Sequence, residues 1–311
     1  MRLIAKTKDM PRDEWLELRK HSLGGSDASV VLGLNDWRSQ YTLWADKRGL
    51  IGDNPDNEAM RIGRDLEQYV AERFCEATGK KVHRRNAMFA HDDYDFISAN
   101  VDREVVGENA GLECKTTSVF NKSDFENGVI PLYYYCQCMH YMSVMGYDKM
   151  YLAILVLGKA FYWFEIKRDE TEIAALLSTE VNWWNKYILG DEVPEIDGSD
   201  STTNTLKEVY SEVKDESVAL YGFEELAKNY KQATAKAKEY KDLAETYKNQ
   251  IAGLIGEHEA ADLNGYTVTY KSQSKTTVDS KKLKAEMPEI YKKYTNTTTS
   301  RVLRVKELKE A

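Results

Sequence analysis

The sequence has few cysteines and lacks any long apolar run, and each shortage excludes a class of protein. Its four cysteines, at positions 75, 114, 136 and 138, form no CxxC pair and no other spacing typical of a zinc site, so we expect reduced, mostly buried thiols. No apolar stretch approaches the roughly 18 residues of a membrane span, and the opening segment MRLIAKTKDMPRDEW has no apolar signal region. We therefore expect a cytoplasmic protein with no membrane partner.

An excess of positive charge is also missing. The chain has 43 Lys and Arg against 51 Asp and Glu, a net charge of −8. This balance argues against a protein that coats nucleic acid over its whole surface, although a local basic channel is compatible with it. At 311 residues, 42% hydrophobic and 11% aromatic, the chain can form a folded, soluble protein with one good-sized domain and a smaller one, or two domains.

The stretch FISANVDREVVGENAGLECKTT, residues 96–117, concentrates acids and a lysine among residues that favour strands. Apolar and polar residues alternate in its first part, EVVGENAG supplies a turn, and LECK begins a second strand. Because side chains in a strand alternate between faces, Glu113 and Lys115 point the same way and Asp102 can lie opposite them. The pattern predicts a hairpin that carries two carboxylates and an ammonium group.

Two carboxylates in such a hairpin require a proton or a cation. At about 4 Å they repel by roughly 4 kcal/mol at an effective dielectric near 20. Oxygen-only ligation suits Mg²⁺, for which Mn²⁺ can substitute, and a lysine beside such an ion could position or deprotonate the water that attacks a phosphodiester. In a chain with 30% charged residues the same spacing also arises by chance, as structural ion pairs.

A second candidate site lies near the N-terminus. Residues 13–21 (DEWLELRKH) predict a short helix, and GGSD before an apolar run, residues 24–32, predicts the start of another. A helix start can bind phosphate, and Arg19 is close enough in sequence to contribute. The alternative is that Ser26 serves only as the N-cap of this helix.

Helices and strands alternate in the middle of the chain. Residues 61–78 predict a helix that ends at Gly79, with Glu67 at its apolar edge, where it either leans towards the hairpin or is an ordinary exposed glutamate. Residues 81–90 predict a strand, and residues 131–145 a buried helix in which Gln137 and Tyr141, four apart, share one face. A second hairpin, residues 150–157 and 160–166, precedes a helix over 170–189. This order predicts an α/β fold with a mixed sheet flanked by helices.

Together these features resemble the PD-(D/E)xK nuclease superfamily. Within it, GGSDASVVLGLNDWRSQYTLW resembles the YqaJ-type viral recombinases, relatives of phage lambda exonuclease, over roughly residues 10–195. The resemblance implies a restriction-endonuclease-like sheet and a metal held by Asp102, Glu113 and the backbone carbonyl of Cys114. Val101 stands where the superfamily motif often has a proline.

The resemblance also assigns roles to the other candidate residues. Lys115 would activate the water, and Glu67 would join the metal shell directly or through water. Gln137 and Tyr141 would support the catalytic site. Arg19 and Ser26 match in type and spacing the family residues that hold the 5′-terminal phosphate.

The activity that the resemblance implies is a Mg²⁺-dependent 5′→3′ exonuclease that degrades one strand of double-stranded DNA from an end and leaves a 3′ single strand for recombination. It also implies a homo-oligomeric ring, a single-strand annealing recombinase as partner, and a phage or prophage protein in the bacterial cytoplasm. A restriction-like endonuclease, or a non-catalytic DNA-binding or assembly protein, remains the alternative.

The last third of the chain predicts a separate domain. We expect a nuclease domain over residues 1–195, an acidic, Ser/Thr-rich linker over 196–216 and a C-terminal domain over 217–311. In the last, apolar residues spaced by three and four from Phe223 to Leu254 predict a long helix, which either packs as a coiled coil or folds back on its own domain. A strand over 265–270, a short capped helix and a returning strand, SRVLRVKEL, would complete a small α+β appendage.

Overall fold

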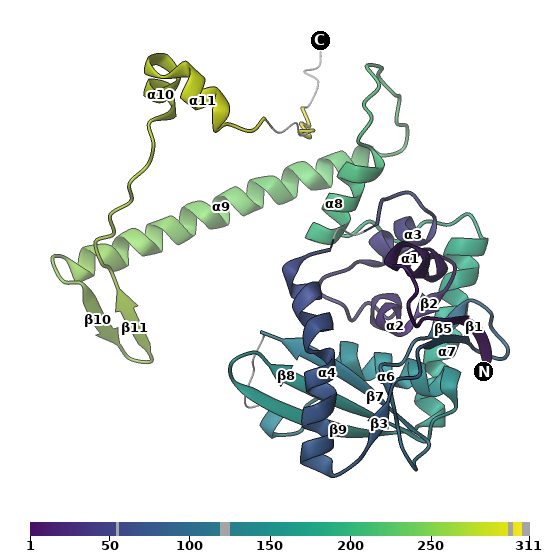
Figure 1. Ribbon diagram of the computed structural model, residues 1–311. Helices are drawn as coiled ribbons and strands as arrows, with labels where there is room; N and C mark the ends of the chain where they lie inside the picture. Colours follow the sequence, from purple (N-terminus) through teal and green to yellow (C-terminus); the bar gives the residue numbers. More distant parts are fainter. Residues whose placement is uncertain (54–55, 119–124, 298–300, 307–311) are drawn as a thin grey trace. The chain divides into compact units, whose positions relative to one another are not determined.

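The computed structural model describes residues 1–53, 56–118, 125–297 and 301–306 (Figure 1). The chain divides into two compact units, Met1–Val213 and Lys214–Ala311. Within the described residues, no helix combines the length and the apolar character that crossing a membrane requires.

A five-stranded mixed sheet organises the first unit. Its order is β3-β6-β7-β8-β9, and β7 pairs with β8 in parallel while the other pairs are antiparallel. The bounds are β3 Val82–His83, β6 Arg103–Val105, β7 Ala110–Thr117, β8 Lys149–Val156 and β9 Ala160–Lys167. This mixed sheet, flanked by helices, confirms the predicted fold class.

Helices cover both faces of this sheet. Tyr151 and Ala153 of β8 pack with helix α4 (Glu58–Thr78), whereas Met150 and Leu152 pack in the cluster that contains helix α6 (Leu132–Met145). Successive β8 side chains therefore enter two different cores, which explains why this strand reads as an unbroken apolar run. In Figure 1, α4 crosses one face of the sheet.

A smaller sheet lies beside the first and corrects the predicted hairpin. Its order is β1-β4-β5-β2, with bounds Arg2–Lys6, Ala87–Ala90, Ile97–Ala99 and Leu23–Gly24. The predicted first strand of the hairpin is thus β5, which pairs with β4 and β2, and the hairpin itself is formed by β6 and β7. The predicted strand over 81–90 is likewise divided between the two sheets, because Asn86 has a positive φ of 47°.

The remaining helices of the first unit follow the sequence closely. Helices α1 (Arg12–Lys20), α2 (Gly25–Val31) and α3 (Gln40–Lys47) precede the sheets, and α7 (Glu170–Trp184) continues into a π-helical turn, Asn185–Leu189. Helix α4 ends at Gly79 with φ 71°, and α6 ends at Gly146 with φ 69°, which are left-handed conformations that favour glycine. Both helix ends confirm the sequence prediction.

The predicted linker over 196–216 contains a helix. Helix α8 (Asp200–Val209) buries Thr202, whose hydroxyl donates to Ser39 Oγ at 2.8 Å, and Thr205, whose hydroxyl lies 2.8 Å from Thr42 Oγ1. These partners flank or belong to α3, so the first unit extends to Val213. Composition alone misled the prediction, because here the polar side chains bond to a neighbouring helix instead of to water.

The second unit contains the predicted long helix, α9 (Glu224–Ile255). An antiparallel pair follows, β10 (Ala260–Leu263) with β11 (Tyr266–Thr269), of which only β11 was predicted. The predicted capped helix is two helices, α10 (Ser280–Glu286) and α11 (Pro288–Lys293), because Pro288 begins a new helix. The predicted returning strand is not formed over residues 301–306, and its remainder lies outside the described residues.

Candidate active site

The predicted acids and lysine meet around β7. Glu113 and Lys115 lie on the same face of the strand, with Nζ of Lys115 2.7 Å from Oε1 of Glu113. Asp102, just before β6, accepts a hydrogen bond from the backbone N–H of Cys114 at 2.8 Å. The pairing of β6 with β7, Arg103 opposite Leu112, sets this alignment. The sequence thus placed these residues correctly although it misplaced the strand before Asp102.

Helix α6 supports the site from the neighbouring layer. Nε2 of Gln137 donates to Oε1 of Glu113 at 2.6 Å and to the hydroxyl of Tyr141 at 3.0 Å. Both α6 side chains are buried. The predicted shared face of Gln137 and Tyr141 is confirmed, and Gln137 makes the direct contact with the carboxylate.

The charges of the site are unbalanced in favour of the acids. Burial, followed by the carboxylates of Glu113 and Glu67, raises the pKa of Asp102 well above its usual range. Burial disfavours the charged form of Lys115, but Glu113 and Asp102 outweigh it and raise the pKa of this ammonium. The buried carboxylate of Glu113 and the half-buried carboxylate of Asp102 lie beside a single ammonium, so a further cation would balance the charge.

One atom of this cluster fits a metal ligand. Oε2 of Glu113 is buried and has no hydrogen-bond partner among the described residues. Buried carboxylate oxygens are normally satisfied, and hard cations such as Mg²⁺ take carboxylate and carbonyl oxygens. The donors present, Asp102, Glu113 and the carbonyl of Cys114, therefore fit such an ion.

Glu67 stands apart from this pair. Its Oε1 lies 2.5 Å from Nη1 of Arg103 and 3.4 Å from Nη2 of Arg84. Arg103 also donates to the backbone carbonyl of Asp102 at 2.7 Å. Among the described residues no three His, Cys, Asp or Glu side chains gather as a metal cluster. Glu67 thus lies near the site but is ion-paired with arginine, and its role in a metal shell stays a prediction.

The predicted phosphate residues are also brought together. Nη2 of Arg19 donates to Oγ of Ser26 at 2.6 Å, and the Arg19 guanidinium stacks 4.7 Å from the ring centre of Trp15. The N-cap of α2 is Gly24, so the predicted alternative for Ser26 is wrong. The backbone N–H of Gly24 donates to Oδ2 of Asp27 at 3.0 Å. The Ser26 hydroxyl therefore does not cap the helix and instead accepts the hydrogen bond from Arg19.

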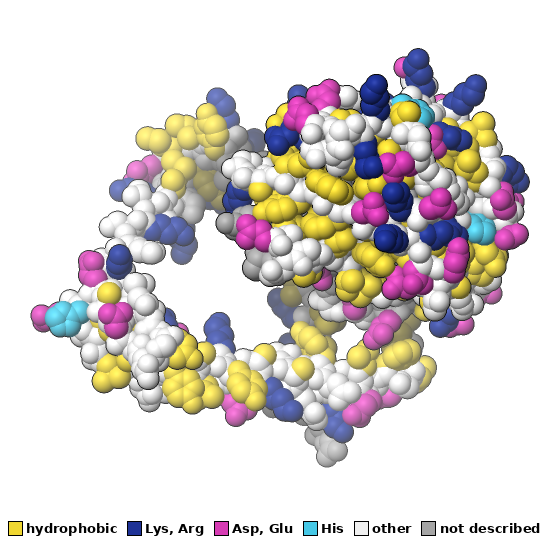
Figure 2. Space-filling view, turned by 90° about the horizontal axis from the view of Figure 1, so that it is seen from below, with side chains coloured by type: hydrophobic (Ala, Val, Ile, Leu, Met, Phe, Trp, Pro, Cys, Tyr) yellow, Lys and Arg dark blue, Asp and Glu magenta, His cyan; other side chains and the backbone are white. Residues whose placement is uncertain are grey.

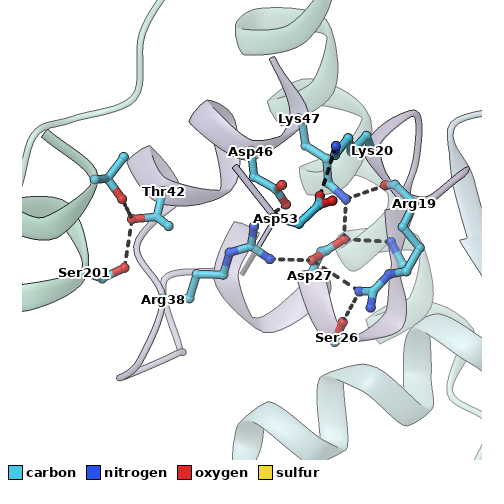
Figure 3. A network of polar contacts seen from close by, with 12 residues as sticks. Arg19, Lys20, Ser26, Asp27, Arg38, Thr42, Asp46, Lys47, Asp53 and Ser201 are labelled. Carbon is cyan, nitrogen blue, oxygen red and sulfur yellow. Dashed lines mark hydrogen bonds and ion pairs between the residues drawn. The ribbon is translucent and has the colours of Figure 1, made fainter. Parts of the chain in front are cut away.

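Sequence reasoning missed the buried carboxylate beneath this pair. Asp27 is 1% exposed, and its carboxylate lies 2.9 Å from Nζ of Lys47, 3.5 Å from Nη1 of Arg38 and 3.9 Å from Nη2 of Arg19 (Figure 3). Burial opposes its ionisation, but these three cations hold the pKa of Asp27 well below its usual range. Lys47 also donates to the Arg19 carbonyl at 2.7 Å, which fixes the end of α1.

A second buried pair also escaped prediction. His140 and Glu180 are both fully buried, with Nδ1 of His140 2.7 Å from Oε1 of Glu180 and Nε2 2.8 Å from the carbonyl of Ser98. The pair joins α6, α7 and β5. No local signal reveals it, because the partners are far apart in the sequence.

Gly25, next to Ser26, brings α2 close to the helix that carries Gln137 and Tyr141. A Cβ added to Gly25 would lie 2.6 Å from the Tyr141 ring and 3.0 Å from Cγ of Gln137. Only glycine therefore allows α2 to approach α6 so closely. On the face drawn in Figure 2, basic and acidic side chains are interspersed over the first unit.

Comparisons with known proteins relate this chain to YqaJ-like proteins. A family model described as the YqaJ-like viral recombinase domain matches residues 14–148. The chain is 38% identical over 311 residues to the uncharacterized protein YqaJ of Bacillus subtilis (strain 168), covering 98% of each chain. Protein D345L of African swine fever virus (strain Badajoz 1971 Vero-adapted) is 33% identical over 88 residues, 27% of this chain and 26% of that protein. Among solved structures, an alkaline exonuclease (LHK-Exo) from Laribacter hongkongensis is similar over 57% of this chain and 93% of its own, at 18% identity and a TM-score of 0.46.

Proposed function

The chain belongs to the YqaJ-like viral recombinase family, and from this premise we propose that it is a Mg²⁺-dependent deoxyribonuclease that degrades linear double-stranded DNA in the 5′→3′ direction. The observation that carries the proposal is the meeting of Asp102, Glu113 and Lys115 at β7, where one buried oxygen of Glu113 has no partner among the residues that the structure describes. Lys115 and Gln137 account for Oε1 of Glu113, and a bound hard cation would account for its Oε2.

Each residue has a definite task in this proposal. Asp102, Glu113 and the carbonyl of Cys114 would hold the metal, which when bound supplies Lewis-acid stabilisation of the phosphate charge. Lys115 would hold the attacking water and donate a hydrogen bond to it. Gln137 fixes the Glu113 carboxylate, so that the acid keeps its orientation when DNA binds.

The direction of digestion is proposed to come from Arg19 and Ser26. Their adjacent guanidinium and hydroxyl are suited to a terminal 5′-phosphate, since arginine binds phosphate through charge-assisted hydrogen bonds. In the same proposal the 3′ single strand passes to a single-strand annealing recombinase, and the protein acts as a homo-oligomeric ring around DNA.

The test is digestion of three duplex substrates in Mg²⁺ or in EDTA. The substrates are linear DNA with a 5′-phosphate, linear DNA with a 5′-hydroxyl, and covalently closed circles. We expect rapid loss of the 5′-phosphorylated strand alone, only with Mg²⁺. Cutting of closed circles would instead identify an endonuclease, and no digestion with Mg²⁺ or Mn²⁺ would leave a binding or assembly role.

A matched pair of variants assigns the activity to the site. Lys115→Ala should lower the rate at least about 100-fold, the lower range for a group acting on a transferred proton or nucleophile. Lys167→Ala removes the same charge from an exposed position on β9 and should leave the rate unchanged. Equal loss of rate in both variants would contradict the proposed site.

A further inference from the structure

Helix α9 carries an apolar seam that the described residues of the second unit leave open. Residues spaced alternately by three and four form the seam from Phe223 to Leu254. Of the described residues in this helix only Ile255 is buried, whereas Leu226 is 67% and Leu254 86% exposed. Hydrophobic side chains are visible along the helix in Figure 2. A contiguous apolar surface of this kind marks an interaction site.

The period of the seam specifies a helical partner. All ten positions of the seam are apolar or tyrosine, a strict repeat of 3.5 residues over more than four heptads. An ideal straight helix drifts by about 20° per heptad relative to such a repeat, so over this length the seam winds around the helix by nearly a quarter turn. A second helix with the same repeat follows this winding by supercoiling with the first, so the seam stays in contact along its whole length.

We propose that α9 pairs with α9 of a second copy of this chain, in antiparallel orientation. With the twofold axis between residues 238 and 239, Phe223 meets Leu254 of the other copy and Leu226 meets Ile251. Bulky apolar residues thus close both ends of the seam. Three of the four central positions are alanines, which let the helices approach closely in the middle.

The flanking charges select the antiparallel direction. In a parallel pair the positions on either side of the seam would place Lys236 opposite Lys241 of the other copy, twice by symmetry. Like charges in such positions are destabilising. In the antiparallel pair Lys236 instead lies beside Leu243 of the other copy. Between residues 224 and 255 six lysines stand against five acids, so the two helices also carry little net charge that would repel.

Light scattering on the full-length protein tests the pairing. Ala237→Glu places a charge in the seam, and we expect it to halve the mass of the particle in solution. Ala235→Glu makes the same change on the outer face of the same helix and should leave the mass unchanged. The far-UV circular dichroism of both variants checks that helix remains. A wild-type mass equal to that of Ala237→Glu would overturn the pairing.

Cysteine cross-linking tests the direction. A mixture of Ala233→Cys and Ala244→Cys proteins should form a disulfide between the two introduced cysteines, identified by peptide mass spectrometry. Ala237→Cys alone should not cross-link to itself, because that contact exists only in a parallel pair. A self-disulfide at position 237 would overturn the antiparallel orientation, and no disulfide between chains in any variant would overturn the pairing. Neither experiment depends on nuclease activity.

Discussion

Replacement of the buried Asp27 by asparagine should strongly destabilise the first unit. Asparagine keeps the shape and can still accept the Gly24 N–H, but it removes the charge that faces Lys47, whose side chain is 2% exposed. Loss of one partner from a buried pair costs about 3–5 kcal/mol, because the other charge remains buried. Burial already lowers the pKa of Lys47, and the Asp27 carboxylate opposes that shift. For a unit of this size, about 2–4 °C per kcal/mol corresponds to a fall in melting temperature of roughly 6–20 °C.

Urea unfolding, followed by tryptophan fluorescence, would measure this cost. The control is Asp53→Asn, which breaks an exposed pair with Lys20 at 3.0 Å and should cost less than about 1 kcal/mol. The double variant Asp27→Asn with Lys47→Met removes both buried charges and should recover part of the loss. Equal losses of unfolding free energy in Asp27→Asn and Asp53→Asn would contradict the predicted cost of leaving Lys47 buried without its partner.

Three further predictions concern other contacts of the first unit. Arg19→Ala should reduce the preference for 5′-phosphorylated over 5′-hydroxyl ends about 10- to 100-fold, the value of one or two hydrogen bonds to a charged group; an unchanged ratio of rates would contradict its role. Gly25→Ala should cost about 1–3 kcal/mol in urea unfolding, since its Cβ would meet the Tyr141 ring at 2.6 Å; a neutral effect would show that α2 can move. Burial opposes the charge of His140, but Glu180 outweighs it and raises the pKa of His140 above 6.5. The stability from this pair is therefore complete below pH 6.5 and is lost as pH rises through the raised pKa, and His140→Gln should remove that pH dependence of unfolding.

The residues of the β7 site could be predicted because their signals are local. Glu113 and Lys115 are two apart on one strand, and Gln137 and Tyr141 four apart on one helix, so periodicity alone places each pair on one face. The supporting helices were predicted for the same reason. Their apolar spacing and their terminal glycines are both recognisable within a short stretch of sequence.

The missed features depend on partners that are distant in the sequence. Lys47 is twenty residues from Asp27, and nothing in its own segment distinguishes it from a solvated lysine. The passage of β5 into the smaller sheet was missed because Ile97 to Val101 keeps the alternating pattern of a strand, while its pairing depends on β2 and β4. Local pattern gives the type of an element, but not the sheet to which it belongs.

The close approach of Gly25 to Tyr141 has a consequence for the spacing of the two candidate sites. Arg19 of α1 bonds to Ser26 at the start of α2, whereas Glu113 is bonded to α6 through Gln137. Because these two helices are in contact at a glycine, any larger residue at position 25 would have to separate them. If the first group holds the DNA end and the second hydrolyses the strand, the packing of α2 on α6 sets the distance between the bound end and the bond that is cut.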